Sequence, residues 1–410
     1  MSETAPMWRL PIETTHHLAG SAGELVFVGG AGDFDEKGKI RHPGQLFDQI
    51  PGAVANVSAA LAIESATLAD VVRLKAYYQS DATVNEWEVL ASIAKTLAVP
   101  MLPVISLIPV PLQPFDGQAI QVQAIALRKW RDGKDIRVVT RSVPDEFKAF
   151  GLDEITSGLR AGEFLSLAAR TASDTLGTID STENGPSQTH AIMTSMESDL
   201  TQLGASFQDA VKKEGYYFGT TREHWREMAQ VRASYFREPG PPATVVPCHV
   251  LWPENALTKV EVLAMRTTRS GFDKYIARED HWPRRVWDWP IPLPYRQGIK
   301  LRNTIWLGGQ VPSPPFDNAP RRVLPGNLKA QTAFTMSYIE DLLRGFERQS
   351  ADLKLAVCYF RSTGTAQETL NFVSTLVDCM GGALPPVTLV PQPHMHTDES
   401  TVEIWGVAQG

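Results

Sequence analysis

Asp70-Val-Val-Arg-Leu-Lys-Ala-Tyr-Tyr78 decides the fold, because its pattern occurs three times in this chain. Asp209-Ala-Val-Lys-Lys-Glu-Gly-Tyr-Tyr217 and Asp352-Leu-Lys-Leu-Ala-Val-Cys-Tyr-Phe360 keep the same frame: an Asp, a mostly apolar strand and two aromatic residues. The copies lie roughly 140 residues apart, which is too long for a solenoid unit and fits a whole domain. The sequence therefore predicts three tandem copies of one small α/β domain, with the aromatic pairs packed in the core and between the repeats.

Three domains fit the length of 410 residues, and each is large enough for its own core. We place them at 1–145, 146–280 and 281–410. Repeat 2 is the most divergent, with Ala168-Ala169 where repeat 1 has Gly29-Gly30. Hydrophobic spacing predicts the order ββαβαββ in each repeat, which gives an α+β fold with helices on one face of a sheet.

In repeat 1 we expect the strand 25–28 to end at Gly29-Gly30 and to form a hairpin through the turn 35–38. The helix expected within 45–63 contains Pro51, which is a candidate for its first residue. The remaining predicted elements of the chain are the strands 71–78, 104–110, 119–127, 163–168, 245–251, 259–265, 304–307, 387–390 and 401–407, and the helices 85–97, 189–203, 223–236, 328–346 and 366–380.

The composition is that of an ordinary globular protein, with 43% hydrophobic and 21% charged residues. The net charge of −7 and the absence of a Lys/Arg run argue against a nucleic-acid partner. No apolar run reaches the roughly 18 residues of a membrane span, so no membrane partner is expected. The chain starts without a basic and apolar leader, and its three cysteines lack metal-type spacing. Together these features predict a cytoplasmic protein.

The order and spacing of several motifs resemble a known family. Tyr295-Arg-Gln-Gly298, a strand, Gly308-Gly309-Gln310, two helices and the closing strands are similar to the RidA/YjgF/YER057c/UK114-like proteins, and the other two repeats follow the same plan. The family has a chorismate-mutase-like fold and forms homotrimers, with a central β-barrel and ligand clefts between subunits. The resemblance implies that this single chain folds as a pseudo-trimer, as a monomer or a dimer.

The resemblance also implies chemistry that needs no cofactor and no metal. Members of the family hydrolyse enamines and imines to a ketoacid and ammonia. An Arg holds the substrate carboxylate, a Glu on the last strand orients a water, and backbone N–H groups stabilise developing charge. We expect the backbone at Gly30 and Gly309 to contribute to this binding of substrate.

The Arg of the family is missing from all three repeats. Its position holds Ile105, Ala243 and Val387, each followed by a Ser or Thr that we expect to bind substrate: Ser106, Thr244 and Thr388. This change argues against a free α-imino acid bound through its carboxylate, unless another cation serves. It suggests a neutral or cyclic substrate.

The position of the last-strand Glu aligns with Gln121, Glu261 and Glu403. A Gln can orient a water but cannot take its proton, so acid–base chemistry is expected at Glu261 or Glu403; exposed carboxylates on an edge strand are the alternative. The family's active-site Tyr aligns with Tyr295 and, within one residue, with His17. We therefore expect three unequal clefts, of which one works.

Two further groups of residues have open interpretations. Trp282, Trp287 and Trp289 are expected to dock on neighbouring repeats, with a Trp-lined ligand site as the alternative. His394 and His396, with Asp398 nearby, resemble a metal-ligand cluster, although a solvated loop or a position at the rim of a cleft fits the spacing as well.

The sequence predicts a hydrolase or deaminase that acts on a C–N bond of a small molecule, an enamine, an imine or a related amide-type compound. Two alternatives remain: a binding or regulatory protein without catalysis, and a ring-opening hydrolase or lyase on the same scaffold. A Ser–Lys type of pair in a cleft would favour the last.

Overall fold

The repeated aspartates begin the same structure in every repeat of the computed structural model. Asp70, Asp209 and Asp352 each end a one-turn 3-10 helix just before the long strand. Each carboxylate accepts the backbone N–H of the residue three positions earlier, at 2.8 to 2.9 Å. This contact satisfies a donor that the short helix leaves unpaired. The Asp in the repeated motif is therefore a cap that fixes where the strand starts.

The structure describes residues 7–81, 83–133, 135–173, 179–180, 183–219, 222–266, 279–285, 287–315 and 322–410. The first six residues, on which part of the prediction of localisation rests, lie outside these ranges.

Each repeat follows the predicted order of elements, and repeats 2 and 3 have an additional strand at the start. Repeat 1 contains β1 (Ala19–Ala22), β2 (Leu25–Ala31), α1 (Leu46–Ile63), β3 (Val71–Gln79), α2 (Glu86–Leu97), β4 (Val104–Val110) and β5 (Ile120–Leu127). Repeat 2 contains β6 (Ile136–Ser142), β7 (Glu154–Ala161), β8 (Phe164–Arg170), α3 (Gly185–Gln202), β9 (Ala210–Phe218), α4 (Arg222–Ala233), β10 (Ala243–Cys248) and β11 (Thr258–Met265). Repeat 3 contains β12 (Glu279–His281), β13 (Gly298–Leu301), β14 (Thr304–Leu307), α5 (Leu328–Gly345), β15 (Leu353–Arg361), α6 (Ala366–Cys379), β16 (Val387–Gln392) and β17 (Val402–Gln409).

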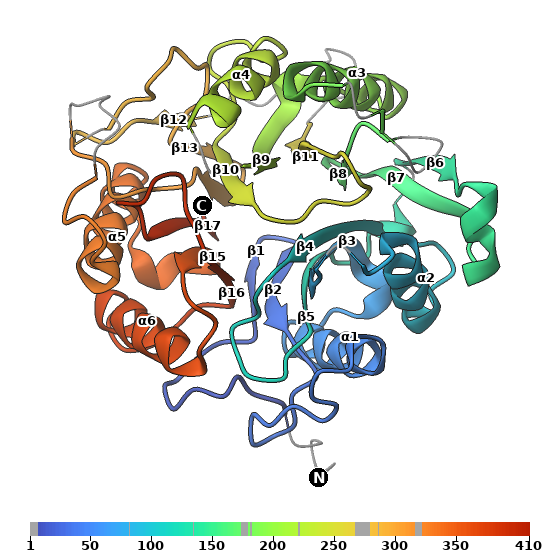
Figure 1. Cartoon of the computed structure of the whole chain (residues 1–410), viewed down its shortest axis with the longest axis horizontal. Helices are drawn as coiled ribbons and strands as arrows, with labels where there is room; N and C mark the ends of the chain where they lie inside the picture. Colours follow the sequence, from blue (N-terminus) through green and yellow to red (C-terminus); the bar gives the residue numbers. More distant parts are fainter. Residues whose placement is uncertain are drawn as a thin grey trace.

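The three sheets share one topology. Their strand orders are β1-β2-β5-β3-β4, β6-β7-β8-β11-β9-β10 and β12-β13-β14-β17-β15-β16. Within each sheet the last two strands are parallel and the other pairs are antiparallel. Figure 1 shows the three units arranged around a centre, with the strands inside and the helix pairs α1/α2, α3/α4 and α5/α6 on the outside. The predicted α+β fold is thus present in all three repeats.

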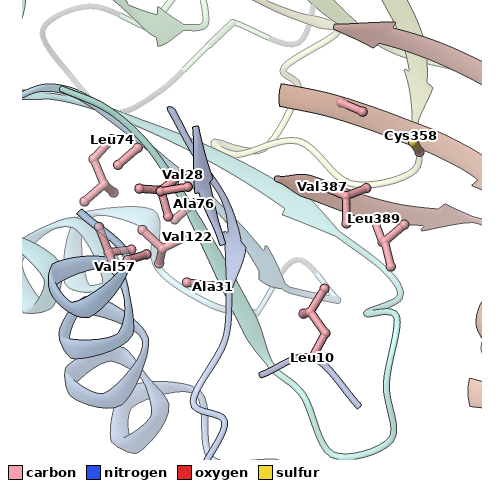
Figure 2. Close-up of a cluster of buried hydrophobic side chains, with 14 of the residues drawn as sticks. Leu10, Val28, Ala31, Val57, Leu74, Ala76, Val122, Cys358, Val387 and Leu389 are labelled. Atoms are coloured by element: carbon pink, nitrogen blue, oxygen red, sulfur yellow. The ribbon is translucent and has the colours of Figure 1, made fainter. Parts of the chain in front are cut away.

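Helix α1 covers the outer face of the first sheet and supplies one side of its core. Figure 2 shows Val57 of this helix over Ala76 and Val122 of the sheet, and all three side chains are fully buried. By length and composition α1 is also the one helix of the described chain that could cross a membrane. Its apolar face is packed in the core of repeat 1, as expected for the core helix of a globular domain.

The inner faces of the three sheets meet in a second apolar core that no single repeat could build. At its centre, the hydroxyl of Tyr359 lies 2.9 Å from that of Tyr77 and 3.1 Å from that of Tyr216. These tyrosines occupy the same place in the three copies of the repeated motif, so their predicted packing between repeats is confirmed. The described strand pairs form three separate sheets, and no strand pairing among them closes the predicted barrel.

A buried network of four charges joins repeats 1 and 2 next to the tyrosines. Arg73 donates to Glu261 at 2.8 Å, and Lys75 lies 3.0 Å from Glu214 and also contacts Glu261. All four side chains are essentially inaccessible to solvent. Because removal of one partner would leave the others buried and unpaired, this network fixes how the first two repeats face each other.

Several local predictions need correction. The hairpin of β2 is formed with the preceding strand β1, through Gly23, whose φ is +61°. The turn 35–38 closes only an isolated bridge between Phe34 and Ile40. Strand β2 runs on past Gly29-Gly30 to Ala31. Helix α1 begins at Leu46 with Pro51 inside it. Strand β6, which precedes the predicted boundary at 145, pairs with β7 in the sheet of repeat 2.

Candidate active site between repeats 2 and 3

Strand register identifies the equivalent residues of the three clefts. Gln121 lies opposite Tyr77, Glu403 opposite Tyr359, and Lys259 opposite Tyr216. The prediction that Glu261 holds this position in repeat 2 is therefore wrong by two residues. Side chains two apart on a strand share a face, so the sequence pattern alone could not separate the two registers. Glu261 lies in the central charge network, where the cations of repeat 1 hold its pKa below the ordinary value.

The cleft between repeats 1 and 3 is filled by glutamine side chains. Gln121 donates to the carbonyl oxygen of Leu389 at 2.6 Å, and Gln123 donates to Thr388 Oγ1 at 3.0 Å. A Cβ at Gly30 would lie 2.3 Å from the Gln121 side-chain oxygen, so the backbone there is tightly covered. His17 is exposed, and its backbone N–H donates to the Leu384 carbonyl. Gly30, Gln121 and Thr388, each predicted to bind substrate, thus lie together in this cleft and contact one another or the neighbouring backbone.

The cleft between repeats 1 and 2 holds an ion pair in place of a free carboxylate. Lys259 donates to both oxygens of Glu86, at 2.5 and 2.7 Å, and to the Leu107 carbonyl at 2.8 Å. Ser106 Oγ accepts the backbone N–H of Ala169 at 2.9 Å. These contacts line a pocket with an empty volume of about 700 Å³, including its open mouth. All three hydrogens of the Lys259 ammonium are already in use.

The cleft between repeats 2 and 3 also contains a pocket, with an empty volume of about 830 Å³ including its mouth. Gly309 and Glu403 both line it, and Thr244 lies beside Gly309. A Cβ at Gly309 would lie 1.9 Å from Glu403 Oε1 and 2.9 Å from Thr244 Oγ1, so only a glycine leaves this carboxylate in place. The backbone N–H of Gly309 donates to the Ala243 carbonyl and joins the two repeats.

Glu403 belongs to a chain of three polar side chains. His396 Nε2 lies 2.6 Å from Glu403 Oε2, and His396 Nδ1 lies 3.3 Å from the hydroxyl of Tyr217. The tautomer with the proton on Nε2 satisfies both contacts, because it donates to Glu403 and accepts from Tyr217. The second carboxylate oxygen, Oε1, is left for the side of the pocket that Gly309 and Thr244 form.

Two basic side chains line the same pocket without a hydrogen bond among the described residues. Lys213 Nζ and all three guanidinium nitrogens of Arg232 are buried in this way. Burial lowers the pKa of Arg232 to about 10, which still leaves it charged near neutral pH. A buried cation without a partner is costly, so a ligand anion would be strongly favoured here.

Tyr295 contributes a buried ring to the pocket wall. Its hydroxyl has no hydrogen-bond partner in the described part of the chain, and its ring centroid lies 5.1 Å from Lys213 Nζ. Burial raises the pKa of its hydroxyl, so it remains a proton donor at neutral pH. The structure thus brings together Tyr295, Glu403, Thr244 and Gly309 of the predicted site residues.

Behind the pocket, Lys212 supports Thr244. Its Nζ donates to Thr244 Oγ1 at 2.7 Å and to the Leu307 carbonyl at 3.0 Å. Burial, the largest cause, lowers the pKa of Lys212 to about 7 although nearby carboxylates oppose the shift. The Thr244 hydroxyl accepts this hydrogen bond and can turn its own proton towards the pocket.

The Trp-rich segment forms one wall of the pocket. Trp287 and Trp289 both line it, with ring centroids 4.5 Å apart, and Trp287 Nε1 donates to Gln310 at 3.1 Å. Trp225 of helix α4 lies on the opposite repeat. For Trp287 and Trp289 the geometry favours the alternative interpretation, a Trp-lined site. Trp282 is not among the residues that line the pocket.

Comparison with known proteins confirms the predicted resemblance. No family model matches the chain. A stretch of 73 residues is 29% identical to a RutC family protein of Sulfurisphaera tokodaii, and the match covers 18% of this chain and 56% of that relative, about half its length. A chorismatase structure aligns with a TM-score of 0.53 and 14% identity over 83% of this chain and 93% of its own.

Rv2704 of Mycobacterium tuberculosis, a member of the YjgF/YER057c/UK114 family, is 26% identical with a TM-score of 0.25 and covers 31% of this chain and 99% of its own. The match to the RutC family protein supports the similarity to the RidA/YjgF group that the motifs predicted. At 14% identity the likeness to the chorismatase shows the fold alone.

Sequence reasoning missed four residues of this pocket: Lys213, Arg232, Tyr217 and Trp225. Tyr217 was predicted to pack in the core, and Arg232 lies on a helix where a basic residue normally faces solvent. A signal existed for Lys213, because it stands where repeats 1 and 3 have Leu74 and Ala356 in the repeated motif. His396 lies at the cleft, one of the places considered for it, and no group of three or more potential metal ligands occurs among the described residues.

Proposed function

We propose that the pocket between repeats 2 and 3 is the active site of a cofactor-free hydrolase that acts on a C–N bond of a small enamine or imine bearing a carboxylate. The observation that carries this proposal is a single geometry: Glu403, held by His396, shares the pocket with the guanidinium of Arg232, which has no hydrogen bond within the described part of the chain. Neither of the other clefts offers a carboxylate at the position of Glu403.

Arg232 supplies the cation that the Ala243 position of this cleft lacks. A guanidinium presents two parallel N–H groups to a carboxylate and remains charged at neutral pH. The substrate predicted from sequence was neutral or cyclic because no Arg precedes Thr244. With Arg232 approaching from helix α4, a simple imino acid again fits the pocket.

Glu403 is the water-orienting group in this mechanism. Its Oε1 accepts a hydrogen bond from water, and the water oxygen attacks the electrophilic imine carbon while its proton passes to the carboxylate. As the C–O bond forms, Tyr295 gives its proton to the nitrogen, which yields a carbinolamine. The C–N bond then breaks when Glu403 passes its proton to the nitrogen and the carbinol hydroxyl returns its proton to Tyr295, so that ammonia and a carbonyl compound are released. His396, backed by Tyr217, stabilises the glutamate in its ionised form through the Nε2 hydrogen bond. Tyr295 and Thr244 are proton donors to the bound substrate.

We also propose that one chain is the complete functional unit, a pseudo-trimer whose inner faces close around the central tyrosines like the barrel of the homotrimeric relatives. The hydrogen-bonded tyrosines and the charge network between repeats support this arrangement. Light scattering should then give an active species with the mass of one chain or two. Activity confined to a trimer of chains would contradict it.

The test is an ammonia-release assay with 2-iminopropionate generated in situ, followed by neutral and cyclic enamines and amides. We expect release from the imino acid, loss of kcat in Glu403→Gln and a raised KM in Arg232→Met. Release from neutral compounds alone would contradict the role of Arg232. If no compound reacts but carboxylates bind, the protein is a binding protein without catalysis.

A second candidate is hydrolysis of a cyclic carboxylate, which the aromatic wall favours. Trp225, Trp287 and Trp289 offer flat apolar surface beside Arg232, and such surface suits a ring better than a three-carbon acid. Lys212 and Thr244 form a hydroxyl–amine pair similar to the Ser–Lys pair that would favour a ring-opening hydrolase or lyase. Chorismate belongs in the substrate panel because a structural relative is a chorismatase. Its consumption, followed by chromatography, would favour this candidate over the imine reaction.

A further inference from the structure

Lys213 carries an amine at a position of the repeated motif where the other two repeats have an aliphatic side chain. It lies four residues after Asp209 in the repeated motif, where repeat 1 has Leu74 and repeat 3 has Ala356, both buried in the outer core. The side chain of Lys213 is likewise inaccessible, but it lines the open pocket instead of closed core. Its Nζ has no hydrogen-bond partner among the described residues.

The surroundings of Lys213 favour the neutral amine. Burial is the largest cause that lowers its pKa well below the ordinary value, followed by the positive charges of Arg232 and Lys212. Glu403 and Glu214 oppose the shift more weakly. Because burial is the largest cause, a ligand carboxylate that offsets the charge of Arg232 removes only a smaller part of this shift. A lysine that is desolvated and placed beside another cation has a free lone pair at neutral pH, as a nucleophile requires.

We propose that Lys213 is a nucleophilic amine that forms a covalent imine with small carbonyl compounds bearing a carboxylate. The Nζ lone pair attacks the carbonyl carbon and forms the C–N bond, and the proton that nitrogen loses goes to the carbonyl oxygen. The carbinolamine then expels this oxygen as water and leaves a C=N bond to Nζ. No oxidant or reductant takes part, and the reaction reverses by addition of water.

The neighbours of Lys213 fit this step. Arg232 lines the same pocket with unpaired N–H groups for the carboxylate of the carbonyl compound. Tyr295, whose ring lies 5.1 Å from Nζ, has an unpaired hydroxyl that can donate to the oxygen that leaves. The ligand class is therefore a 2-oxo acid or an aldehyde acid. Imine formation on Lys213 requires the pocket but does not require the protein to hydrolyse a substrate, so it can be tested separately from the proposed function.

Borohydride trapping tests the inference on the full-length chain. The protein is incubated with pyruvate or glyoxylate, reduced with borohydride, and examined by intact mass and by peptide fragmentation, which separates Lys213 from its neighbour Lys212. We expect one stable adduct per chain, located on Lys213. It should be lost in Lys213→Met and in Lys213→Arg, and kept in Lys95→Met, which removes an exposed lysine of helix α2.

Both Lys213 variants are checked for folding by thermal unfolding, and Lys213→Arg keeps a basic side chain where Lys213→Met does not. No adduct on the wild type, or an adduct that survives in the Lys213 variants, would overturn the inference. If imine hydrolysis proceeds without any adduct, the proposed function stands and this inference is wrong. If the adduct forms and no substrate is hydrolysed, the reverse is true.

Discussion

Lys259 lies opposite Tyr216 in the register of β9 and β11, in the place that Glu403 takes opposite Tyr359. The two side chains give their clefts opposite characters. Lys259 forms an ion pair with Glu86, whereas Glu403 keeps one carboxylate oxygen on the pocket side. Divergence at this one position therefore distinguishes a cleft whose basic side chain is held in an ion pair from a cleft equipped for acid–base chemistry.

Replacement of Glu403 by Gln is expected to lower kcat for imine hydrolysis by roughly 10²–10⁴-fold, the usual contribution of a general base. The amide keeps the shape and can still bind a water, so KM should change little. Steady-state ammonia release measures both constants. A variant that keeps more than half of the wild-type kcat would remove Glu403 from the mechanism.

Glu261→Gln is the matched control on the other glutamate. It removes a charge that Arg73 and Lys75 share in the interior, and it should lower the free energy of unfolding by about 3–5 kcal/mol. The kcat of the folded fraction should equal that of the wild type, because this network lies outside the pocket. Urea unfolding and an assay corrected for the folded fraction separate the two effects. Loss of kcat without loss of stability would restore Glu261 as a site residue.

Gly309→Ala and Gly30→Ala each add a Cβ next to the side chain at the equivalent position of the last strand. That side chain is Glu403 in the cleft between repeats 2 and 3 and Gln121 in the cleft between repeats 1 and 3. The new Cβ at 309 displaces the Glu403 carboxylate, and a displacement of about 1 Å is expected to lower kcat roughly 100-fold. At position 30 the methyl group meets Gln121 instead, which should cost about 1–3 kcal/mol of stability and leave kcat unchanged. Equal losses of kcat in both variants would show that the cleft with Gln121 also works.

His396→Gln and His394→Gln compare two histidines in one loop. His396 contacts Glu403, whereas the ring of His394 lies 5.2 Å from that of His249. Gln at 396 lacks the ring geometry that lets one side chain donate to Glu403 and accept from Tyr217, so Glu403 is held less firmly and kcat should fall with KM nearly unchanged. The 394 variant should behave like the wild type. A raised KM with full kcat at 396 would indicate that this histidine binds substrate instead.

Lys213→Met should stabilise the protein near neutral pH. The folded-state pKa of Lys213 lies below the unfolded value of about 10.4, so the unfolded state binds more protons and the wild type becomes more stable as pH rises towards that value. The Met variant has no titratable group at this position and so avoids the free-energy cost of burying Lys213. Its gain in melting temperature should be larger at about pH 7 than at about pH 10, and it should not decrease below about pH 7 on account of Lys213. A gain that does not depend on pH would show that Lys213 is not held neutral.

The repeat explains why so much of the fold was predictable. Three copies of one strand pattern, each with an Asp cap and two aromatic residues, fix local structure in the same way three times. The helices and the closing strands fall within a few residues of their predicted ranges. The hairpin of β2 was missed because its turn uses Gly23 after a strand of only four residues, and such a short strand leaves little periodicity to read.

By itself, the sequence determined the three-fold repetition, the α+β class and the resemblance to the RidA group, and it named Glu403, Tyr295, Thr244 and Gly309 as candidate site residues. Only the tertiary structure decided the character of each cleft, because Gln121, Lys259 and Glu403 differ in the partners they find across a repeat boundary. It also placed Arg232 and Lys213 together, although one is on a helix and the other on a strand. Such pairs depend on strand register and on packing between repeats, which arise from contacts distant in sequence that local patterns do not encode.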